Sequence, residues 1–351
     1  MTRLALVMIA KDEARGIGRA LESARAHVDR MIVLDTGSSD ATREIAAAAG
    51  AEVGGFAWAD DFAAARNAAL ALSDAAWNLV LDADEWIAGG AAALKTLPAA
   101  GGDAIGVVRL ENAVDPSTGE GGGAVWLPRV LPRGVRYEGR VHEQPVGAAR
   151  QQRLGLVLGH DGYLPENLAR KADRNEQLLM AELQAAPDDA YLWFQLAKEH
   201  QVRARPPQAA ICFAEALRLA PPDAPYRHPL VVRGLNALKA AGRLDDALAL
   251  AGAEIGNWQG SPDFFFALGD LYLECASQAP DRAATDFLPI VESAWKRCLE
   301  IGEQPGLEGA VAGRGGHMAA HNLAVFYETL GQPTEAARYQ ALARKLARRG
   351  R

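Results

Sequence analysis

Trp77-Asn-Leu-Val-Leu81 followed by Asp82-Ala-Asp84-Glu85 is the stretch that decides the fold of the first half of this chain. A short apolar run that ends directly on charged residues predicts a buried strand leading into a loop. Upstream of it, strand-like runs alternate with helical patterns. The expected strands are Leu4–Ile9, Arg30–Leu34 and Glu52–Phe56, and the expected helices are Gly16–Ala26, Arg43–Ala49 and Phe62–Leu72. This alternation predicts an α/β domain with a mixed, mainly parallel sheet and helices on both faces.

The texture of the chain changes twice after this stretch. From about Gly101 to Gly162 it is rich in glycine and proline, with strand-like pieces at Ala104–Leu110, Ala124–Leu131 and Leu154–Leu158 that we interpret as antiparallel additions to the sheet. After Tyr163 the pattern is helical almost throughout. The sequence therefore predicts an α/β domain at residues 1–165 and an all-α domain at residues 166–351.

The second half of the chain repeats itself. Small and large apolar residues fall on the spacing of a tetratricopeptide repeat, in which small residues let paired helices approach and large ones fill the gap between them. A second and a last copy keep parts of the spacing, and Phe265–Tyr272 is a first helix whose partner, around Val291–Leu299, is displaced by an insertion. About four helical hairpins are expected to stack into a short solenoid. The positions of the first copy are Trp193, Leu196, Ala197, Ala209, Phe213, Ala216 and Pro221.

Composition bounds the classes of function. The 351 residues carry a net charge of −7, which argues against general nucleic-acid binding because that binding depends on neutralising phosphates. The three cysteines lie far apart in apolar helical contexts and are expected to be small core residues. No apolar stretch approaches the roughly 20 residues needed to cross a membrane. A cytoplasmic protein without a transmembrane segment is the expectation.

Acidic residues follow three of the expected strands. Asp82 and Asp84 are two residues apart on an extended segment and share a face, so both can point at one hard cation or at the ribose and phosphate of a nucleotide. Asp35 ends the second strand, and Glu13 follows the first. Because parallel strands end at one edge of the sheet, these side chains are expected to gather there. The alternative is purely structural: an acidic turn, a capped β–α turn at Asp35, and a helix N-terminus that favours carboxylates at Glu13.

These motifs resemble those of family 2 glycosyltransferases with the GT-A fold. The matching segments read Lys11-Asp-Glu13, Asp35-Thr-Gly-Ser-Ser-Asp40-Ala-Thr42 and Asp82-Ala-Asp84-Glu85. The stretch from Asp61 to Asn67 is similar to that family's Phe-xxx-Arg-Asn segment, whose arginine corresponds to Arg66. Asp12 stands where the family usually has asparagine, and the Gln-x-x-Arg-Trp motif of polysaccharide synthases is missing, so polymer synthesis is not expected.

The resemblance implies a nucleotide-sugar site. A UDP-sugar would lie across the strand ends, with Glu13 and Asp35 near the uridine, Arg66 positioning the nucleotide or its sugar, and Asp82 near the ribose. A divalent cation, Mn²⁺ or Mg²⁺, would bind at Asp84 and neutralise the departing diphosphate. This predicts a hexosyltransferase-like enzyme of inverting mechanism. The structural alternative for Arg66 is a helix-surface residue close to Asp60 and Asp61.

Later histidines extend the resemblance to a bacterial subgroup that includes peptide S-glycosyltransferases, which have similar Gly-x-x-His-Glu and His-x-Gly-Tyr segments. These are the segments around His142 and His160. By this resemblance, His160 is a further metal ligand beside Asp84. An inverting displacement also needs a general base, for which Glu143 is the first candidate and His142 the second. The structural alternative for both is pairing with Arg140 or Arg136.

Two other functions compete with this prediction. Repeats of this type typically hold extended peptides, which favours a protein or peptide acceptor for the transferred sugar. The first competing function is a non-catalytic interaction scaffold, in which the α/β domain would be a degenerate nucleotide binder. A nucleotidyltransferase would also place carboxylates at strand ends. It should carry a glycine-rich phosphate loop after its first strand, and Lys11-Asp-Glu-Ala-Arg15 is no such loop.

Overall fold

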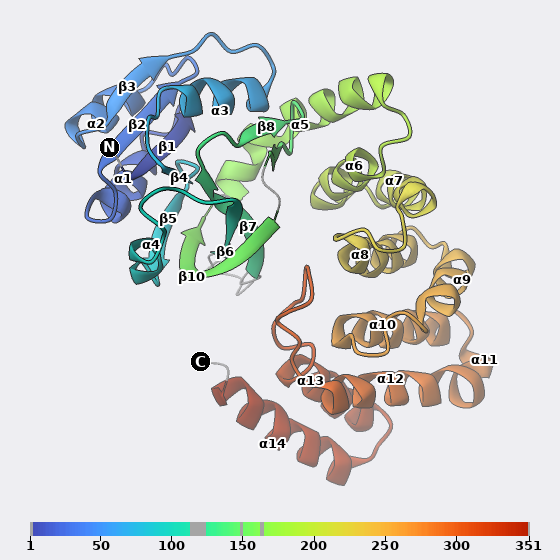
Figure 1. The fold of residues 1–351 in the computed structure, drawn as a ribbon. Helices are drawn as coiled ribbons and strands as arrows, with labels where there is room; N and C mark the ends of the chain where they lie inside the picture. Colours follow the sequence, from blue (N-terminus) through green and yellow to red (C-terminus); the bar gives the residue numbers. More distant parts are fainter. Residues whose placement is uncertain (1–2, 113–123, 148–149, 162–164, 350–351) are drawn as a thin grey trace. The chain divides into compact units, whose positions relative to one another are not determined.

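The computed structural model describes residues 3–112, 124–147, 150–161 and 165–349. These form two compact units, Met1–Leu178 and Leu179–Arg351 (Figure 1). The division between them falls within helix α5 (Pro165–Ala185). The domain boundary after residue 165 stays a prediction.

A mixed sheet forms the centre of the first unit (Figure 1). In the described residues, its strand order is β3-β2-β1-β4-β7-β6-β10-β5, and β8 and β9 form a separate ribbon. The strands of the sheet are β1 (Leu4–Ala10), β2 (Arg30–Asp35), β3 (Glu52–Gly55), β4 (Trp77–Val80), β5 (Glu85–Gly89), β6 (Ala104–Asn112), β7 (Ala124–Pro132) and β10 (Arg150–His160). The ribbon strands are β8 (Arg136–Glu138) and β9 (Gln144–Val146).

The pairing confirms a mainly parallel first half. β1 is parallel to both β2 and β4, and β2 is parallel to β3. β7 runs antiparallel to β4 and β6. The expectation that the later strands are all antiparallel additions is wrong for β10, which is parallel to β6 with Arg150 opposite Ala104. The chain passes through the β8–β9 ribbon after β7 and re-enters the sheet at the end where β6 begins.

Helices cover both faces of this sheet. They are α1 (Ile17–Arg25), α2 (Thr42–Ala48), α3 (Phe62–Ala71) and the short α4 (Ala92–Lys95). Alternate residues of β1 point to opposite faces: Leu6 packs in one core with Leu21 of α1, and Val7 packs in another with Ala69 of α3. The sheet is therefore buried on both sides where β1 crosses it, as its continuous apolar sequence predicts.

The second unit is a stack of helical hairpins (Figure 1). The hairpins pair α6 with α7, α8 with α9, α10 with α12, and α13 with α14. The helices are α6 (Ala190–Val202), α7 (Pro206–Leu219), α8 (Arg227–Ala240), α9 (Leu244–Glu254), α10 (Pro262–Gln278), α11 (Pro280–Arg282), η1 (Ala283–Phe287), α12 (Leu288–Ile301), α13 (His317–Thr329) and α14 (Pro333–Arg349). The short α11 and η1 are the insertion that displaces the partner of α10.

Small residues permit the close approach of these helices. A Cβ at Gly269 of α10 would lie 2.4 Å from Nε1 of Trp295 on α12, so only glycine fits against that indole ring. All three cysteines are buried and free, which confirms them as core residues. Phe213 and Phe264 are fully buried in the stack. The packing thus follows the alternation of small and large residues seen in the repeat.

A loop from Gly302 to Gly315 separates α12 from α13 and folds back on the stack. Its ends meet, because a Cβ on Gly315 would lie 2.2 Å from the Gly302 oxygen. Its body reaches two helices: the Val311 amide donates to Asp263 of α10 at 3.0 Å, and His228 Nδ1 of α8 contacts the Glu308 main-chain oxygen at 2.6 Å. It is therefore a closed Ω-type loop pinned by side chains rather than a free connection.

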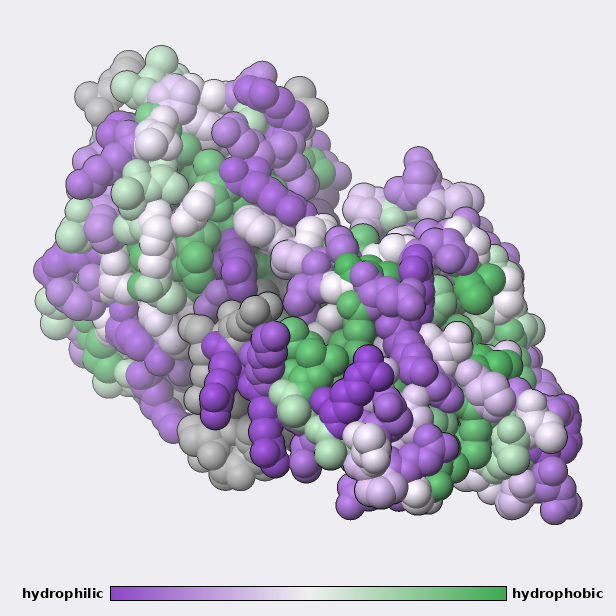
Figure 2. All heavy atoms as spheres, turned by 90° about the horizontal axis from the view of Figure 1, so that it is seen from below, coloured by the Kyte–Doolittle hydropathy of each residue, from purple (hydrophilic) through white to green (hydrophobic). Residues whose placement is uncertain are grey.

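Hydrophilic and hydrophobic residues are intermixed on the face drawn in Figure 2. Large apolar side chains that are exposed include Met180, Val202 and Ile211. Among the described residues, no helix combines the length and the apolar character needed to span a bilayer.

Candidate nucleotide-sugar site

The carboxyl ends of β1, β2 and β4 lie at one edge of the sheet. In the parallel pairing, Ala10 of β1 is opposite Asp35 of β2, and Val7 is opposite Val80 of β4. Leu81 then leads from β4 to Asp82. The three acidic motifs therefore occupy the edge at which ligands bind in sheets of this type.

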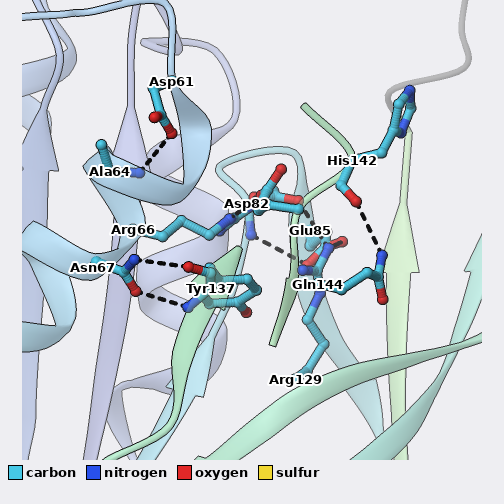
Figure 3. A network of polar contacts seen from close by, with 11 residues as sticks. Asp61, Ala64, Arg66, Asn67, Asp82, Glu85, Arg129, Tyr137, His142 and Gln144 are labelled. Carbon is cyan, nitrogen blue, oxygen red and sulfur yellow. Dashed lines mark hydrogen bonds and ion pairs between the residues drawn. The ribbon is translucent and has the colours of Figure 1, made fainter. Parts of the chain in front are cut away.

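Asp82 is held between two arginines (Figure 3). Its Oδ1 accepts a hydrogen bond from Arg66 Nη2 at 2.6 Å, and its Oδ2 accepts one from Arg129 Nη2 at 2.8 Å. Arg66 comes from α3 and is buried, so the alternative of a helix-surface arginine is wrong. Helix α3 begins where the Asp61 side chain accepts from the Ala64 amide at 2.8 Å, and this cap fixes where Arg66 falls on the helix.

Each arginine also pairs with a second carboxylate. Arg66 Nε donates to Glu143, and Arg129 Nη2 donates to Glu85. Glu85 Oε2 in turn accepts from the Asp82 amide at 3.1 Å. Burial raises the pKa of the Glu85 carboxyl, against the opposing charge of Arg129. Burial disfavours the Arg66 cation, but the charges of Asp82 and Glu143 outweigh it and raise the Arg66 pKa well above its usual value.

The β8–β9 ribbon brings Glu143 to this network. Asn67 of α3 holds the ribbon through the main chain of Tyr137. Its Nδ2 donates to the Tyr137 main-chain oxygen at 2.9 Å, and its Oδ1 accepts from the Tyr137 amide at 2.7 Å. Glu143 meets Arg66 rather than Arg140 or Arg136, and Arg136 pairs instead with Glu138. The structural alternative for Glu143, pairing with Arg140 or Arg136, is therefore wrong.

His142 is arranged differently from Glu143. Its φ of 53° is in the left-handed region, so the backbone turns sharply there. Its main-chain oxygen accepts from Gln144 Nε2 at 3.1 Å, and Figure 3 shows its ring pointing away from Asp82. Glu143, the first of the two candidates for the general base, is the one that forms an ion pair with Arg66.

Two polar atoms, one on Arg66 and one on Tyr137, are buried without a hydrogen-bond partner in the described part of the chain. They are Arg66 Nη1 and the Tyr137 hydroxyl. The Arg66 guanidinium lies 5.4 Å from the centroid of the Tyr137 ring. Burial raises the pKa of this tyrosine, which keeps its hydroxyl protonated at neutral pH. A buried donor without an acceptor is costly, so the site holds unused hydrogen-bonding capacity.

Asp84 and His160 form a pair next to this network. His160 ends β10 opposite Glu85 of β5, and its Nε2 lies 3.5 Å from Asp84 Oδ2. Burial lowers the His160 pKa, but the hydrogen bond and the charge of Asp84 raise it by more, so the net shift is upward. The two side chains that the sequence assigned to a metal are thus adjacent.

A second group of contacts adjoins the Asp84–His160 pair and involves Arg19, Trp86 and Asp161. The Arg19 guanidinium lies 3.7 Å from the Trp86 ring centroid and forms an ion pair with Asp161 at 2.6 Å. The Asp161 amide donates to the main-chain oxygen of Asp84 at 3.4 Å. These contacts fix the backbone on both sides of the Asp84–His160 pair.

Asp35 and Glu13 lie at the same edge but make different contacts. Asp35 is buried, and its carboxylate accepts from the amides of Gly37 and Ser38, both at 3.1 Å. This is the capped turn of the structural alternative. The Glu13 amide donates to Thr42 Oγ1 at 2.7 Å, which ties the loop after β1 to the start of α2. A role for either residue in binding uridine stays a prediction.

The charges at this edge suit a divalent cation. Four acidic side chains, one of them paired with His160, lie beside two guanidiniums, so carboxylates outnumber arginines in this part of the edge. In the described residues no group of three or more His, Cys, Asp or Glu side chains could hold a metal. Mg²⁺ and similar ions are usually held by one or two carboxylates together with substrate phosphates, so a pair is sufficient. The charged groups are Asp82, Asp84, Glu85, Glu143, Arg66 and Arg129.

Sequence reasoning missed part of this site. It singled out Arg66, Asp82 and Glu143, which the structure joins, but it gave no role to Arg129 or to Glu85. A signal was present: Arg129 interrupts the apolar run Ala124–Leu131, and an arginine within a strand-like run needs a partner if it is buried.

Comparisons with known proteins agree with the two-part architecture. Residues 5–111 match the sequence profile of Glycosyl transferase family 2. A TPR repeat-containing protein of Synechococcus elongatus is 53% identical over 85 residues, which are 24% of this chain and 21% of that protein. The match thus spans about a fifth of that relative's length.

Solved structures with similarity to parts of the chain include a fragment of MamA from Desulfovibrio magneticus RS-1. It is 14% identical and has a TM-score of 0.40, over 52% of this chain and 90% of that one. Another is glucosyl-3-phosphoglycerate synthase from Mycobacterium tuberculosis in complex with Mn²⁺, UDP and glucosyl-3-phosphoglycerate. It is 22% identical and has a TM-score of 0.26, over 33% of this chain and 45% of that one. TM-scores of this size do not establish a shared fold.

Proposed function

We propose that this chain, whose first unit carries a glycosyl transferase family 2 domain, transfers a hexose from a UDP-sugar to an acceptor with inversion at the anomeric carbon. The observation that carries the proposal is the Arg66–Asp82–Arg129 contact beside the Asp84–His160 pair, at the carboxyl edge of a parallel sheet. Nucleotides bind at this edge, and the charge there fits a diphosphate with a divalent cation.

In the proposed reaction, the bond between the anomeric carbon and the diphosphate oxygen breaks while the acceptor atom bonds to the opposite face of that carbon. Asp84 and His160 would hold Mn²⁺, which when bound supplies Lewis acidity to the departing diphosphate. Arg66 has a buried N–H group to offer to a phosphate or sugar oxygen. Asp82 would accept hydrogen bonds from the ribose.

Glu143 is the proposed general base, and it would take the proton of the attacking group. Its carboxylate is nearly buried and is oriented by Arg66. His142 remains the second candidate. An acceptor on a protein or peptide is the proposal that the hairpin stack favours, since stacked hairpins offer extended binding surfaces. Because nucleotide sugars are made in the cytoplasm, a cytoplasmic location is proposed with this donor.

Calorimetric titration with UDP and Mn²⁺ tests the donor site. The parent is expected to bind UDP more tightly with Mn²⁺ than without it. Asp84→Asn and His160→Gln should remove the effect of Mn²⁺. Glu52→Gln is the matched control, since it removes an exposed carboxylate of β3 that pairs with Arg30. Failure of the folded parent to bind any nucleoside diphosphate would overturn the proposal and favour the non-catalytic scaffold.

If UDP binds, UDP-sugars with different hexoses are tested next. Release of UDP in the presence of a candidate acceptor, lost in Glu143→Gln but not in His142→Gln, would assign the base. The opposite pattern would assign His142.

A further inference from the structure

Arg129 makes two contacts through one nitrogen. Its Nη2 donates both to Asp82 Oδ2 and to the buried Glu85, and the same Glu85 accepts from the Asp82 amide. Arg129 and Glu85 therefore contact the side chain and the main chain of Asp82 at once. A pair whose only role was to neutralise buried charge would not need either contact.

The exposure of these side chains shows which member meets a ligand. The Asp82 side chain is 33% exposed, whereas those of Arg129 and Glu85 are 11% and 2% exposed. Asp82 is thus the most exposed of the three side chains, and Arg129 and Glu85 are buried beneath it. A ligand at this edge would touch Asp82 first and would sense Arg129 mainly through it.

The orientation of the Asp82 carboxylate depends on both guanidiniums. Arg66 holds Oδ1 and Arg129 holds Oδ2, so the plane of the carboxylate is fixed from two sides. An aspartate held on one side only could rotate about its side-chain bonds. Charge-assisted contacts of this kind are short and directional, and they pre-organise the group that they hold.

We infer that Arg129, together with Glu85, is a positioning pair that holds Asp82 in the orientation that binds the donor nucleotide. The inference rests on the proposed function. Arg129 acts here through Asp82 and not by contact with the reacting atoms. Lysine should replace it only in part, because the two N–H groups of Nη2 are fixed in the plane of the guanidinium, whereas an ammonium rotates freely at the end of a flexible stem.

The closing experiment separates positioning from stability. In Arg129→Gln/Glu85→Gln both charges of the pair are removed, so no buried charge of the pair is left uncompensated. The fold should survive, as judged by hydrogen exchange in β1 and β4, while the dissociation constant for UDP with Mn²⁺ should rise by about tenfold or more. Arg129→Lys, which keeps the charge, should weaken binding in the same direction.

A second buried pair serves as the control. Arg227 and Glu254 of the helical unit are also an arginine–glutamate pair, with side chains 16% and 6% exposed. Arg227→Gln/Glu254→Gln should leave UDP binding unchanged.

The outcomes distinguish the two proposals. Parent-like UDP binding by the folded Arg129→Gln/Glu85→Gln variant would overturn the inference and leave the pair a structural one. If that variant does not fold, parent-like binding by Arg129→Lys would do the same. A parent that binds no nucleoside diphosphate would overturn the proposed function, and the inference with it.

Discussion

Both units bury arginine–carboxylate contacts, but they arrange them differently. In the α/β unit, contacts run without a break from Glu143 through Arg66, Asp82 and Arg129 to Glu85. In the helical unit, two buried contacts are separate pairs. Arg227 meets Glu254, and Arg314 meets Asp263.

The remaining contacts of these acids explain the difference. Glu254 also accepts from Asn257 and Trp258, and Asp263 also accepts from the Val311 amide, so both acids tie loops to helices. Asp82 instead lies at the edge of a sheet, with its side chain partly exposed and with unused donor capacity behind it on Arg66. The two acids of the helical unit are thus enclosed, with side chains 6% and 1% exposed, whereas the network of the α/β unit reaches solvent at Asp82.

The largest expected effect on stability comes from Glu85→Ala. The substitution removes a buried charge and leaves Arg129 with Asp82 alone, and breaking a buried pair costs about 3–5 kcal/mol. Hydrogen exchange of β1 and β4 amides measures the free energy of unfolding of the α/β unit. Glu52→Ala, at an exposed pair, is the control. Equal effects of the two variants would show that the network adds nothing to the fold.

Asp263→Ala should have the next largest effect, in the helical unit. It leaves Arg314 and the Val311 amide without their shared acceptor, which costs about 2–3 kcal/mol. The Ω-type loop should open, and trypsin should cleave after Arg314 faster. Asp246→Ala, which removes an exposed acid of α9, is the control. If Asp263→Ala also weakened UDP binding, the separation of roles between the two units would be wrong.

Much of the fold could be predicted from local patterns. Apolar runs alternating with helices indicated β1, β2, β3 and β4 and their parallel direction, because a helix between two strands returns the chain to the end of the sheet where it started. Small and large residues at repeat spacing indicated the hairpins, because each hairpin packs mainly on the next in sequence. These features depend on neighbours in the chain.

The contacts that complete the site were not predictable in the same way. Arg66 and Glu143 are 77 positions apart, and Arg129 and Asp82 are 47 apart. Periodicity gives the face of a strand but not its partner or register, so no pattern placed Arg129 of β7 next to Asp82. β10 is parallel to β6 because the chain passes through the β8–β9 ribbon before it re-enters the sheet at the end where β6 begins. In the sequence this ribbon is visible only as turn residues.

A smaller effect is expected from pH, in the helical unit. Burial lowers the pKa of His228, against its contact with the Glu308 oxygen and the charge of Asp263, while the charge of Arg314 also lowers it. The unfolded chain then takes up a proton at a higher pH than the folded one. The stabilisation is complete above the ordinary histidine pKa of about 6.5 and is lost as the pH falls below it.

The neutral form fits the contacts of this ring. Nδ1 donates to the Glu308 oxygen, so Nε2 is left to accept from the Ser261 hydroxyl at 2.7 Å. The free energy of unfolding of the parent should fall between about pH 7.5 and pH 5.5 by more than that of His228→Gln. An equal pH dependence in both proteins would contradict the assignment.

The smallest effect is expected from Arg338→Ala on α14. Arg338 pairs with Glu335 one turn away at 3.1 Å, and its side chain is 69% exposed. Solvent screens such a pair, and its loss should cost at most about 0.5 kcal/mol in the unfolding of the helical unit. Glu335 keeps its place in the first turn of the helix, where a carboxylate is favoured without a partner. A loss as large as that of Asp263→Ala would mean that burial is not what separates the strong pairs from the weak ones, and the contrast between network and surface would then need another cause.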